Sequence, residues 1–595
     1  IRAYAARRLE ESGEADAVRE AHARFYLDLA EAAEAEITGP SQVRWLGRLD
    51  AEGANLRCAL QWSRAHGRGE WALRVGCALI LFWRVRCRFR EGRELLGALL
   101  EEIEGEAPAA LRAKALWGAG FLAYMAGELD SARPMLEESL AAFRELGDSR
   151  GTGRALMILG HSPYYYDIPE QLELLEESAD LARTAGDAWC LAHALGAAGY
   201  AHARVNDMRP ARPLFEECLG AAREAGDKQG MRYGLLGLGL VAVVQGDYAA
   251  AELHLAEVRA IVNELDEDLL VANVLSDLGL LALGRGDYVR AGELFEEARA
   301  TLPEAAPRGE VLGPLLGLSR VAHALGDLGR ARELLEEVQA RARPGISVPG
   351  LQWMGELAAD EGDLGAARAL FEEALERSDE RNKLAIARAL HGLGQLARAG
   401  GEARRAASLH DEALRLRWDV GAAPDVAASL EALGGLAAGT GRCQHGARLL
   451  GAAQALRDWG GYARAPWDCP RRDADLTLLR KDLGDRGFEA AFREGRGLSI
   501  DQAVVQASKG RQRRGRPASG WASLTETEQR VAELVAEGLT NPQIAERMFI
   551  ALATVKSHLS NIFSKLGIAR RRELEAEVRR RVEPADRRVR TRDGA

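Results

Sequence analysis

The sequence predicts an all-α protein in which a long solenoid of helical repeats precedes a small module of four helices. Three observations support this prediction. A ten-residue block recurs nine times at nearly constant spacing, residues 523–582 carry helix caps and apolar stripes of their own, and aromatic residues make up only 6% of a chain that contains 64 Gly. Such a composition favours closely packed helices over sheets. A chain of 595 residues also exceeds what one hydrophobic core organises.

Residues 1–105 are predicted to be helical and to lead into the repeats, because apolar residues recur there at spacings of three and four. Two stretches, "AARRLEESGE" (5–14) and "LDAEGANLRCALQWS" (49–63), resemble the segment that follows the nucleotide-binding module in large bacterial signal-transduction ATPases with numerous domains. The resemblance implies that an ATPase core lies upstream of this chain or was lost. The first residue, Ile1 rather than Met, fits a chain that lacks an upstream part.

The recurring block defines the repeat region, residues 106–458. It takes forms such as "LGLVAVVQGD" at 238–247 and "LGLLALGRGD" at 278–287. The second position of the block falls at residues 120, 160, 199, 239, 279, 319, 355, 394 and 434. The steps between these positions are 36 to 40 residues long, so we expect about nine units of roughly 40 residues.

Each unit is predicted to be two helices joined by a tight turn, in which Gly ends the first helix and Asp caps the second. Five residues after the turn Gly comes a small residue that lets the helices cross closely, and Leu172 in the second unit and Gly446 in the last depart from this pattern. The Leu-Gly, Gly-Asp and Ala signposts resemble the tetratricopeptide repeat. The resemblance implies a right-handed superhelix whose groove binds a protein or small-molecule ligand.

Catalytic and cofactor sites are not predicted. A GxxxxGK[ST] loop is absent, and "GLGLVA" (237–242) and "GLGQLA" (392–397) lie at the helix-crossing position of a repeat rather than after a strand. The seven Cys are scattered, which indicates neither a metal site nor a disulfide framework. The most apolar stretch, "GCALILFW" (76–83), is too short to span a membrane. We therefore expect a cytoplasmic protein that is not an enzyme and uses no cofactor or metal.

Charge and composition divide the remaining chain. Residues 459–507 are predicted to be a helical C-terminal cap of the repeats, residues 508–522 a flexible basic linker, and residues 583–595 a disordered basic tail. From Lys509 onward there are 19 Lys and Arg against 11 Asp and Glu, whereas the whole chain has a net charge of −10. A basic end on an acidic chain places any contact with phosphate in this end.

The module at 523–582 begins with two sets of helix signals. Thr525 and Glu528 form a capping box, and Gly538 marks the end of the first helix. Asn541 is predicted to cap the second helix, with Pro542 at its first position. The residues expected to face inward are Val531, Leu534, Val535, Ile544, Ala545 and Met548.

After a short turn at 549–551, a third helix is predicted to run to about residue 566. At 100° per residue its buried stripe is Val555, Leu559, Ile562 and Leu566. The opposite face and its flanks are small, polar and basic, and no Asp or Glu occurs between residues 549 and 572. A helix, a tight turn and a helix of this kind form the geometry that places the second helix in the major groove of DNA.

The stretch "LTETEQRVAELVAEGLTNPQIAERMFIALATVKSHLSNIFSKLGI" resembles the DNA-binding domain of LuxR-type transcription regulators. The family implies four helices and binding as a dimer to double-stranded DNA. By this resemblance Lys556, Ser557 and Ser560 contact bases, and Thr554 and Lys565 contact phosphate. The full set of candidate DNA-binding residues is Asn541, Thr554, Lys556, Ser557, Ser560, Asn561 and Lys565. Ala551 and Leu552 depart from the usual polar residues of the family.

The sequence thus predicts a transcription regulator whose C-terminal helix-turn-helix reads promoter DNA while the repeats receive a protein or small-molecule inducer. The alternative is a protein-interaction scaffold whose DNA-binding module has degenerated, for which Ala551 and Leu552 are the argument. An ATPase-derived enzyme is a third class, and it needs the phosphate-binding loop that these residues lack.

Overall fold

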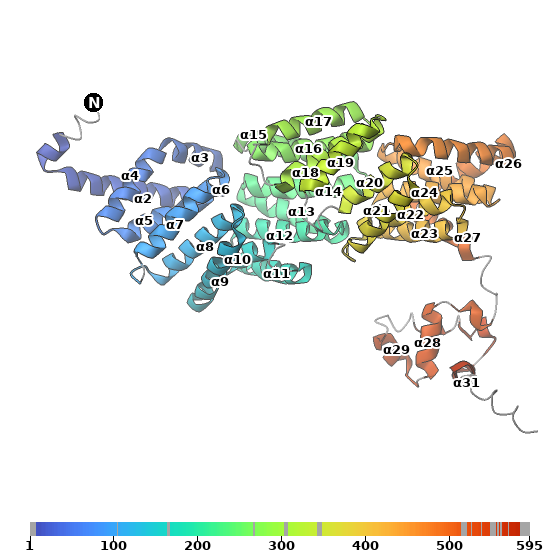
Figure 1. Cartoon of the computed structure of the whole chain (residues 1–595). Coiled ribbons are helices and arrows are strands. Elements are labelled where there is room, and N and C mark those ends of the chain that lie inside the picture. Colours follow the sequence, from blue (N-terminus) through green and yellow to red (C-terminus); the bar gives the residue numbers. More distant parts are fainter. Residues whose placement is uncertain are drawn as a thin grey trace, which may run out of the picture. The chain divides into compact units, whose positions relative to one another are not determined.

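The computed structural model (Figure 1) describes residues 8–103, 105–162, 167–265, 268–302, 308–341, 348–512, 520–524, 526–536, 538–547, 555, 558–559, 562–563, 565–568 and 570–582. In these ranges the chain forms helices and turns and no strand, which confirms the all-α prediction. Two compact units are present, Ile1–Val504 and Val505–Ala595. Of the helices in the described ranges, none combines the length and apolar character needed to cross a membrane.

In the described part of the chain, the helices α2 to α7 precede the predicted repeats. They bury a core that includes Leu27, Ala30, Leu49 and Leu73. Their bounds are α2 Ala15–Glu36, α3 Gln42–Ala51, α4 Gly53–Ala65, α5 Gly69–Ala78, α6 Ile80–Val85 and α7 Phe89–Glu102.

Nine helix pairs follow, and they coincide with the nine blocks in the sequence. The first helices of the pairs are α8 Ala109–Met125, α10 Ser149–His161, α12 Ala188–Arg204, α14 Lys228–Gln245, α16 Asp268–Arg285, α18 Arg308–Ala324, α20 Val348–Asp360, α22 Lys383–Ala399 and α24 Ala423–Gly439. The second helices are α9 Leu129–Leu146, α11 Ile168–Ala185, α13 Met208–Ala225, α15 Tyr248–Leu265, α17 Tyr288–Thr301, α19 Leu328–Arg341, α21 Leu364–Glu376, α23 Ala403–Asp419 and α25 Cys443–Gly460. Each first helix also packs against the first helix of the next pair. We call the surface formed by these first helices the inner wall.

Helix pairs cross where a glycine of the first helix faces a large side chain of the second. In eight pairs, a Cβ atom added to this glycine would lie between 2.6 and 3.3 Å from the facing side chain, as for Gly199 against Phe215. Contacts this short leave no room for a side chain, so the recurring glycine is a packing requirement. The facing residues are Leu136, Leu175, Phe215, Leu255, Phe295, Phe371, His410 and Leu450.

The helices α5, α6 and α7 repeat this arrangement before the first predicted block. Cys87 has φ 52° where the repeats have a turn glycine such as Gly127, with φ 78°. In both turns the next residue donates its backbone N–H to a carbonyl five positions earlier, Arg88 to Trp83 and Glu128 to Ala123. The sequence pattern missed this pair because Cys replaces Gly in the turn and Ile80 replaces Gly in the helix.

Two departures from the repeat pattern have structural explanations. In the first unit Gly120 lies against the carbonyl oxygen of Ala132, which is the small residue of that unit. In the second unit Gly160 lies in the same way against the carbonyl oxygen of Gln171. Gln171 therefore occupies the position of the small residue, and the assignment of Leu172 to that position was wrong. Gln171 is buried, and its Nε2 donates to the carbonyl oxygen of Ser162 at 3.0 Å. In the last unit, a Cβ atom on Gly446 would lie 2.7 Å from the carbonyl oxygen of Gly434, so Ala does not fit.

Repeats far apart in the sequence touch. Asn206 Nδ2 donates to Asn382 Oδ1 at 3.0 Å across 176 residues, and Arg86 Nη1 donates to the carbonyl oxygen of Leu265 at 3.1 Å across 179 residues. These separations correspond to between four and five repeats of 40 residues. The solenoid therefore completes one superhelical turn in that length, and successive turns contact each other.

After the repeats come η1 Pro466–Asp468, α26 Cys469–Arg496 and α27 Ile500–Gln512. The helix α26 is interrupted at Gly484, where φ is 65° and ψ is 160°. The helix α27 extends to Gln512 and so includes the first residues of the predicted linker. The second unit contains η2 Trp521–Ser523, α28 Glu526–Ala536, α29 Asn541–Arg547 and α31 Arg571–Val582.

His410 replaces the Leu or Phe found at the same position of the other pairs. It is fully buried, and in the described part of the chain neither ring nitrogen has a hydrogen-bond partner. Burying unpaired polar groups costs about 1–3 kcal/mol. We expect His410→Leu to raise the denaturant midpoint of the repeat array, by about that free energy, when unfolding is followed by circular dichroism. The reciprocal change Leu450→His in the next pair should lower the midpoint, and an equal midpoint for His410→Leu and the wild type would contradict this assignment.

Buried histidines also predict how stability depends on pH. Burial lowers the pKa of His410 to about 3 and that of His161 to about 4, against roughly 6.5 in an unfolded chain. Below pH 6.5 the unfolded chain therefore binds protons that the folded chain does not, and the free energy of unfolding falls by up to about 1.4 kcal/mol per pH unit for each group. Burial raises the pKa of Asp277 to about 7. Protonation of this carboxyl group therefore raises the free energy of unfolding as the pH falls below 7, which opposes the effect of the histidines.

His410→Leu isolates one of these contributions. Denaturant midpoints measured between pH 7 and pH 4 should fall less steeply in this variant than in the wild type. Parallel pH profiles would mean that His410 does not resist protonation in the folded chain.

Candidate nucleic-acid interface

The second unit has a hydrophobic core that joins α28, α29, α31 and the described residues of the third helix. The described core residues are Leu524, Val531, Ala532, Leu534, Val535, Ile544, Val555, Leu559, Ile562, Leu574 and Val578. This confirms the inward faces predicted for the first three helices at the described positions, with Ala545 and Leu566 partly buried against the core. Met548, also predicted to face inward, lies outside the described residues. The contribution of α31 through Leu574 and Val578 had no counterpart in the sequence patterns.

The stripe of the third helix determines which side of it faces the core. Val555 and Ile562 are 0% exposed and Leu559 is 6% exposed. The helix therefore turns the side that carries these residues towards α28, α29 and α31. Its other side faces away from the core, as the helical period requires.

The second helix begins one residue earlier than expected for a cap at Asn541. The backbone N–H of Ile544 donates to the carbonyl oxygen of Thr540 at 2.9 Å, and the Thr540 hydroxyl donates to Gln543 Oε1 at 2.8 Å. Thr540 thus holds the cap position, and the prediction that Asn541 caps this helix was wrong. Asn541 Oδ1 instead accepts a hydrogen bond from Arg571 Nη1 of α31 at 2.8 Å.

Glu528 forms an ion pair that the sequence did not predict. Its side chain is 4% exposed, and Lys565 Nζ lies 2.6 Å from Oε2 and 2.9 Å from Oε1. Its predicted capping partner, Thr525, lies outside the described residues. The ion pair connects α28 to the end of the third helix, where the carbonyl oxygen of Lys565 also accepts the backbone N–H of Gly520 at 2.7 Å.

The structure describes two of the seven candidate DNA-binding residues. Asn541 and Lys565 each contact another helix of the module through their side chains. The other five, and the departures at Ala551 and Leu552, lie outside the described residues. These five are Thr554, Lys556, Ser557, Ser560 and Asn561.

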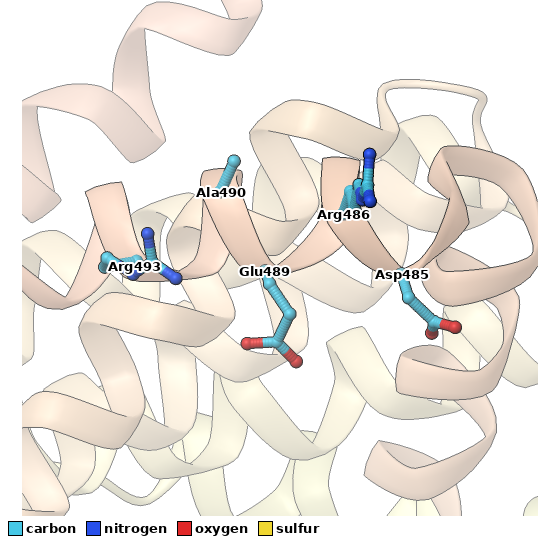
Figure 2. Close-up of a pocket in the computed structure, with 5 residues that line it drawn as sticks. All are labelled: Asp485, Arg486, Glu489, Ala490 and Arg493. Carbon is cyan, nitrogen blue, oxygen red and sulfur yellow. The ribbon is translucent and has the colours of Figure 1, made fainter.

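A surface depression of about 270 Å³ on α26 was also considered as a ligand site. Its lining consists of five residues from one stretch of that helix, Asp485, Arg486, Glu489, Ala490 and Arg493 (Figure 2). Ligand pockets are usually enclosed by several elements, which this depression is not. In the described part of the chain, no cluster of three His, Cys, Asp or Glu side chains could hold a metal ion.

Two family models match the chain. The model described as bacterial regulatory proteins of the luxR family matches residues 522–576, which cover the core of the second unit. A tetratricopeptide repeat model matches residues 232–304, within the helix pairs of the first unit.

Similar proteins include regulators of two mycobacteria. A candidate HTH-type transcriptional regulator of Mycobacterium bovis is 33% identical over 594 residues, which are 98% of this chain. The chain spans 66% of the length of that relative. The DNA-binding transcriptional activator DevR/DosR of Mycobacterium tuberculosis is 39% identical over 118 residues, 19% of this chain and 52% of that protein.

Among solved structures, the crystal structure of NprR in complex with its cognate peptide NprX is similar to this chain, with 12% sequence identity and a TM-score of 0.38. The similarity covers 63% of this chain and 98% of the NprR chain. That likeness is too weak to transfer any property of NprR. The luxR-family match and the mycobacterial relatives are all matches to transcription regulators. The chain therefore carries a LuxR-type helix-turn-helix domain at its C-terminal end, preceded by an array of tetratricopeptide repeats.

Proposed function

We propose that the chain is a transcriptional regulator that binds double-stranded DNA as a homodimer through its LuxR-type domain and receives an inducer on the inner wall of its repeats. The observation that carries the proposal is the buried stripe Val555, Leu559 and Ile562 within a domain matched by the LuxR model. Because the third helix buries this stripe, we expect its polar and basic side to be available to contact DNA.

The residues on that side suit the major groove. By the helical period, Ser557, Ser560 and Asn561 lie opposite the stripe and Lys556 lies on its flank. Short hydroxyl and amide side chains reach base edges at close range, while Lys binds guanine or neutralises phosphate. The absence of any acidic residue from 549 to 572 removes electrostatic repulsion from the DNA backbone.

Lys565 has a second role in this proposal, as a positioning residue. Its Nζ is paired with the buried Glu528 carboxylate, so the ammonium group is held towards α28. The side chain is still 31% exposed, which leaves the ammonium group able to attract a nearby phosphate. We infer that the pair orients the third helix before DNA arrives.

The inner wall of the repeats offers aromatic and titratable groups to an inducer. His161 Nδ1 lies 2.9 Å from the Tyr124 hydroxyl and its Nε2 lies 2.8 Å from the Tyr233 hydroxyl, so hydrogen bonds link the first helices α8, α10 and α14. The Tyr200 ring lies 4.8 Å from the Tyr233 ring. Asp277 continues the same wall on α16. A protein or small molecule with hydrogen-bonding groups could bind there in exchange for these contacts.

DNA binding can be tested by selecting bound duplexes from a random pool with the full chain. We expect enrichment of a two-fold-symmetric motif, because a dimer reads two related half-sites. Lys556→Ala with Ser560→Ala should abolish the enrichment, since both base contacts are then lost.

The matched control is Arg530→Ala, which removes one positive charge from the exposed face of α28. This variant should keep the motif. If neither the wild type nor the control enriches any sequence at low salt, the degenerate-module alternative is favoured.

The positioning role of Lys565 predicts a loss of stability. Lys565→Met removes the ammonium group that pairs with the buried Glu528 carboxylate, which we expect to lower the free energy of unfolding by about 1–3 kcal/mol. Hydrogen exchange of α28 in the full chain, measured without DNA, should accelerate accordingly. The double variant Glu528→Gln with Lys565→Met should recover part of the protection. Unchanged exchange in Lys565→Met, together with weaker DNA binding, would assign Lys565 to phosphate contact alone.

A further inference from the structure

Residues 461–475, which we call the strap, leave the last repeat and run along the inner wall. The strap contacts residues on four first helices, α16, α18, α22 and α24. These residues are Gly284 of α16, Arg320 and His323 of α18, Arg398 of α22, and Glu431 and Gly435 of α24. The wall along these helices is therefore occupied by the chain itself.

Trp467 is held between a ring and a cation. Its indole stacks on the His323 imidazole with ring centres 4.0 Å apart and planes 2° from parallel. The Arg320 guanidinium lies 4.8 Å from the indole centre and 5.1 Å from the ring of Trp353. His323 Nε2 in turn lies 2.8 Å from Asp360 Oδ2, which orients the imidazole.

The strap is also held by its backbone. Ala463 donates its N–H to the carbonyl oxygen of Gly284 at 2.8 Å and accepts a hydrogen bond from Arg457 Nη1 at 2.7 Å. The preceding Tyr462 is 3% exposed, and its ring centre lies 5.9 Å from that of Tyr248. These contacts resemble those that an extended peptide makes in a groove.

Carboxylates at the far end of the strap meet arginines of the wall. Asp475 forms an ion pair with Arg398, with Nη1 and Oδ2 3.1 Å apart. A Cβ atom on Gly435 would lie 2.1 Å from Asp475 Oδ2, and one on Gly286 would lie 2.7 Å from Ala463 Cβ. The wall therefore lacks side chains at two places where the strap passes.

The strap is not part of a sealed core. Pro466, Trp467 and Asp468 are each only partly buried, and the Tyr462 hydroxyl is enclosed without a hydrogen-bond partner in the described part of the chain. An occupant that satisfies this hydroxyl or replaces the Trp467 contacts can therefore compete with the strap.

We propose that the strap is an intramolecular ligand of the inner wall, and that the inducer is a peptide whose extended part replaces residues 462–465 and whose aromatic side chain replaces Trp467. This inference rests on the proposed function, because it names the class of inducer. Arg320 and His323 recognise the aromatic ring. The strap is also the segment through which the repeats continue into α26.

Hydrogen exchange of residues 461–468 in the full chain tests the proposal without DNA. The Ala463 amide should be protected in the wild type, and Trp467→Ala should raise its exchange rate at least tenfold. The matched control is Trp459→Ala, because Trp459 lies on α25, is 74% exposed and precedes the strap. This control should leave the exchange of the strap unchanged.

A peptide probe tests displacement in the wild-type chain. The acetylated peptide of residues 461–470, with Ser in place of Cys469, is added at millimolar concentration, because an intramolecular ligand has an effective concentration of that order. It should raise the exchange of the strap, and the same peptide with Ala in place of Trp should not.

Two results would overturn the proposal. Exchange of the strap at the rate of a free coil in the wild type would mean that it is not a ligand of the wall. Equal exchange with and without the peptide would exclude a peptide of this class and favour a small-molecule occupant. Because neither measurement involves DNA, a failure of DNA binding would leave both results interpretable.

Discussion

The fold depends on the close crossing of two helices at a glycine. At eight of the nine crossings the missing side chain lets a Leu, Phe or His from the second helix lie against the backbone of the first, as Phe295 does against Gly279. Because the crossing recurs about every 40 residues, every pair is rotated similarly relative to the last. A uniform rotation produces a superhelix, and contacts such as that between Asn206 and Asn382 show where one turn meets the next.

One exception to this pattern occurs where another part of the chain passes. Gly435 follows the recurring Gly434 because the ion pair of Asp475 and Arg398 occupies the space of its side chain. Gly446 replaces Ala for a different reason, because a Cβ atom there would lie 2.7 Å from the carbonyl oxygen of Gly434 in the same pair. Each of these residues weakens helix propensity, since Gly costs about 1 kcal/mol relative to Ala in a helix. At Gly435 that cost is offset by packing against a segment that the repeat pattern does not contain.

The regular parts of the fold could be predicted from the sequence and the irregular parts could not. Periodicity located the nine pairs, and the 100° rule placed Val555, Leu559 and Ile562 in the core, because both follow from helix geometry alone. The pair formed by α5 to α7 was not predicted, because Cys87 adopts the turn conformation that glycine adopts in the other pairs. The pairing of Glu528 with Lys565 and the course of the strap depend on tertiary contacts, about which local sequence spacing carries no information.

The energetics of the strap determine which occupants could replace it. Moving an equilibrium from 99% closed to 99% open requires a difference of about 5.5 kcal/mol in favour of the open state. A stacked aromatic pair contributes about 0.5–1.5 kcal/mol and a partly desolvated cation–π contact up to about 2 kcal/mol, so contacts at Trp467 alone fall short of this amount. An occupant must therefore also replace the hydrogen bonds of Ala463 or the ion pair of Asp475. A single aromatic molecule bound at Arg320 and His323 does not extend that far, whereas an extended peptide does.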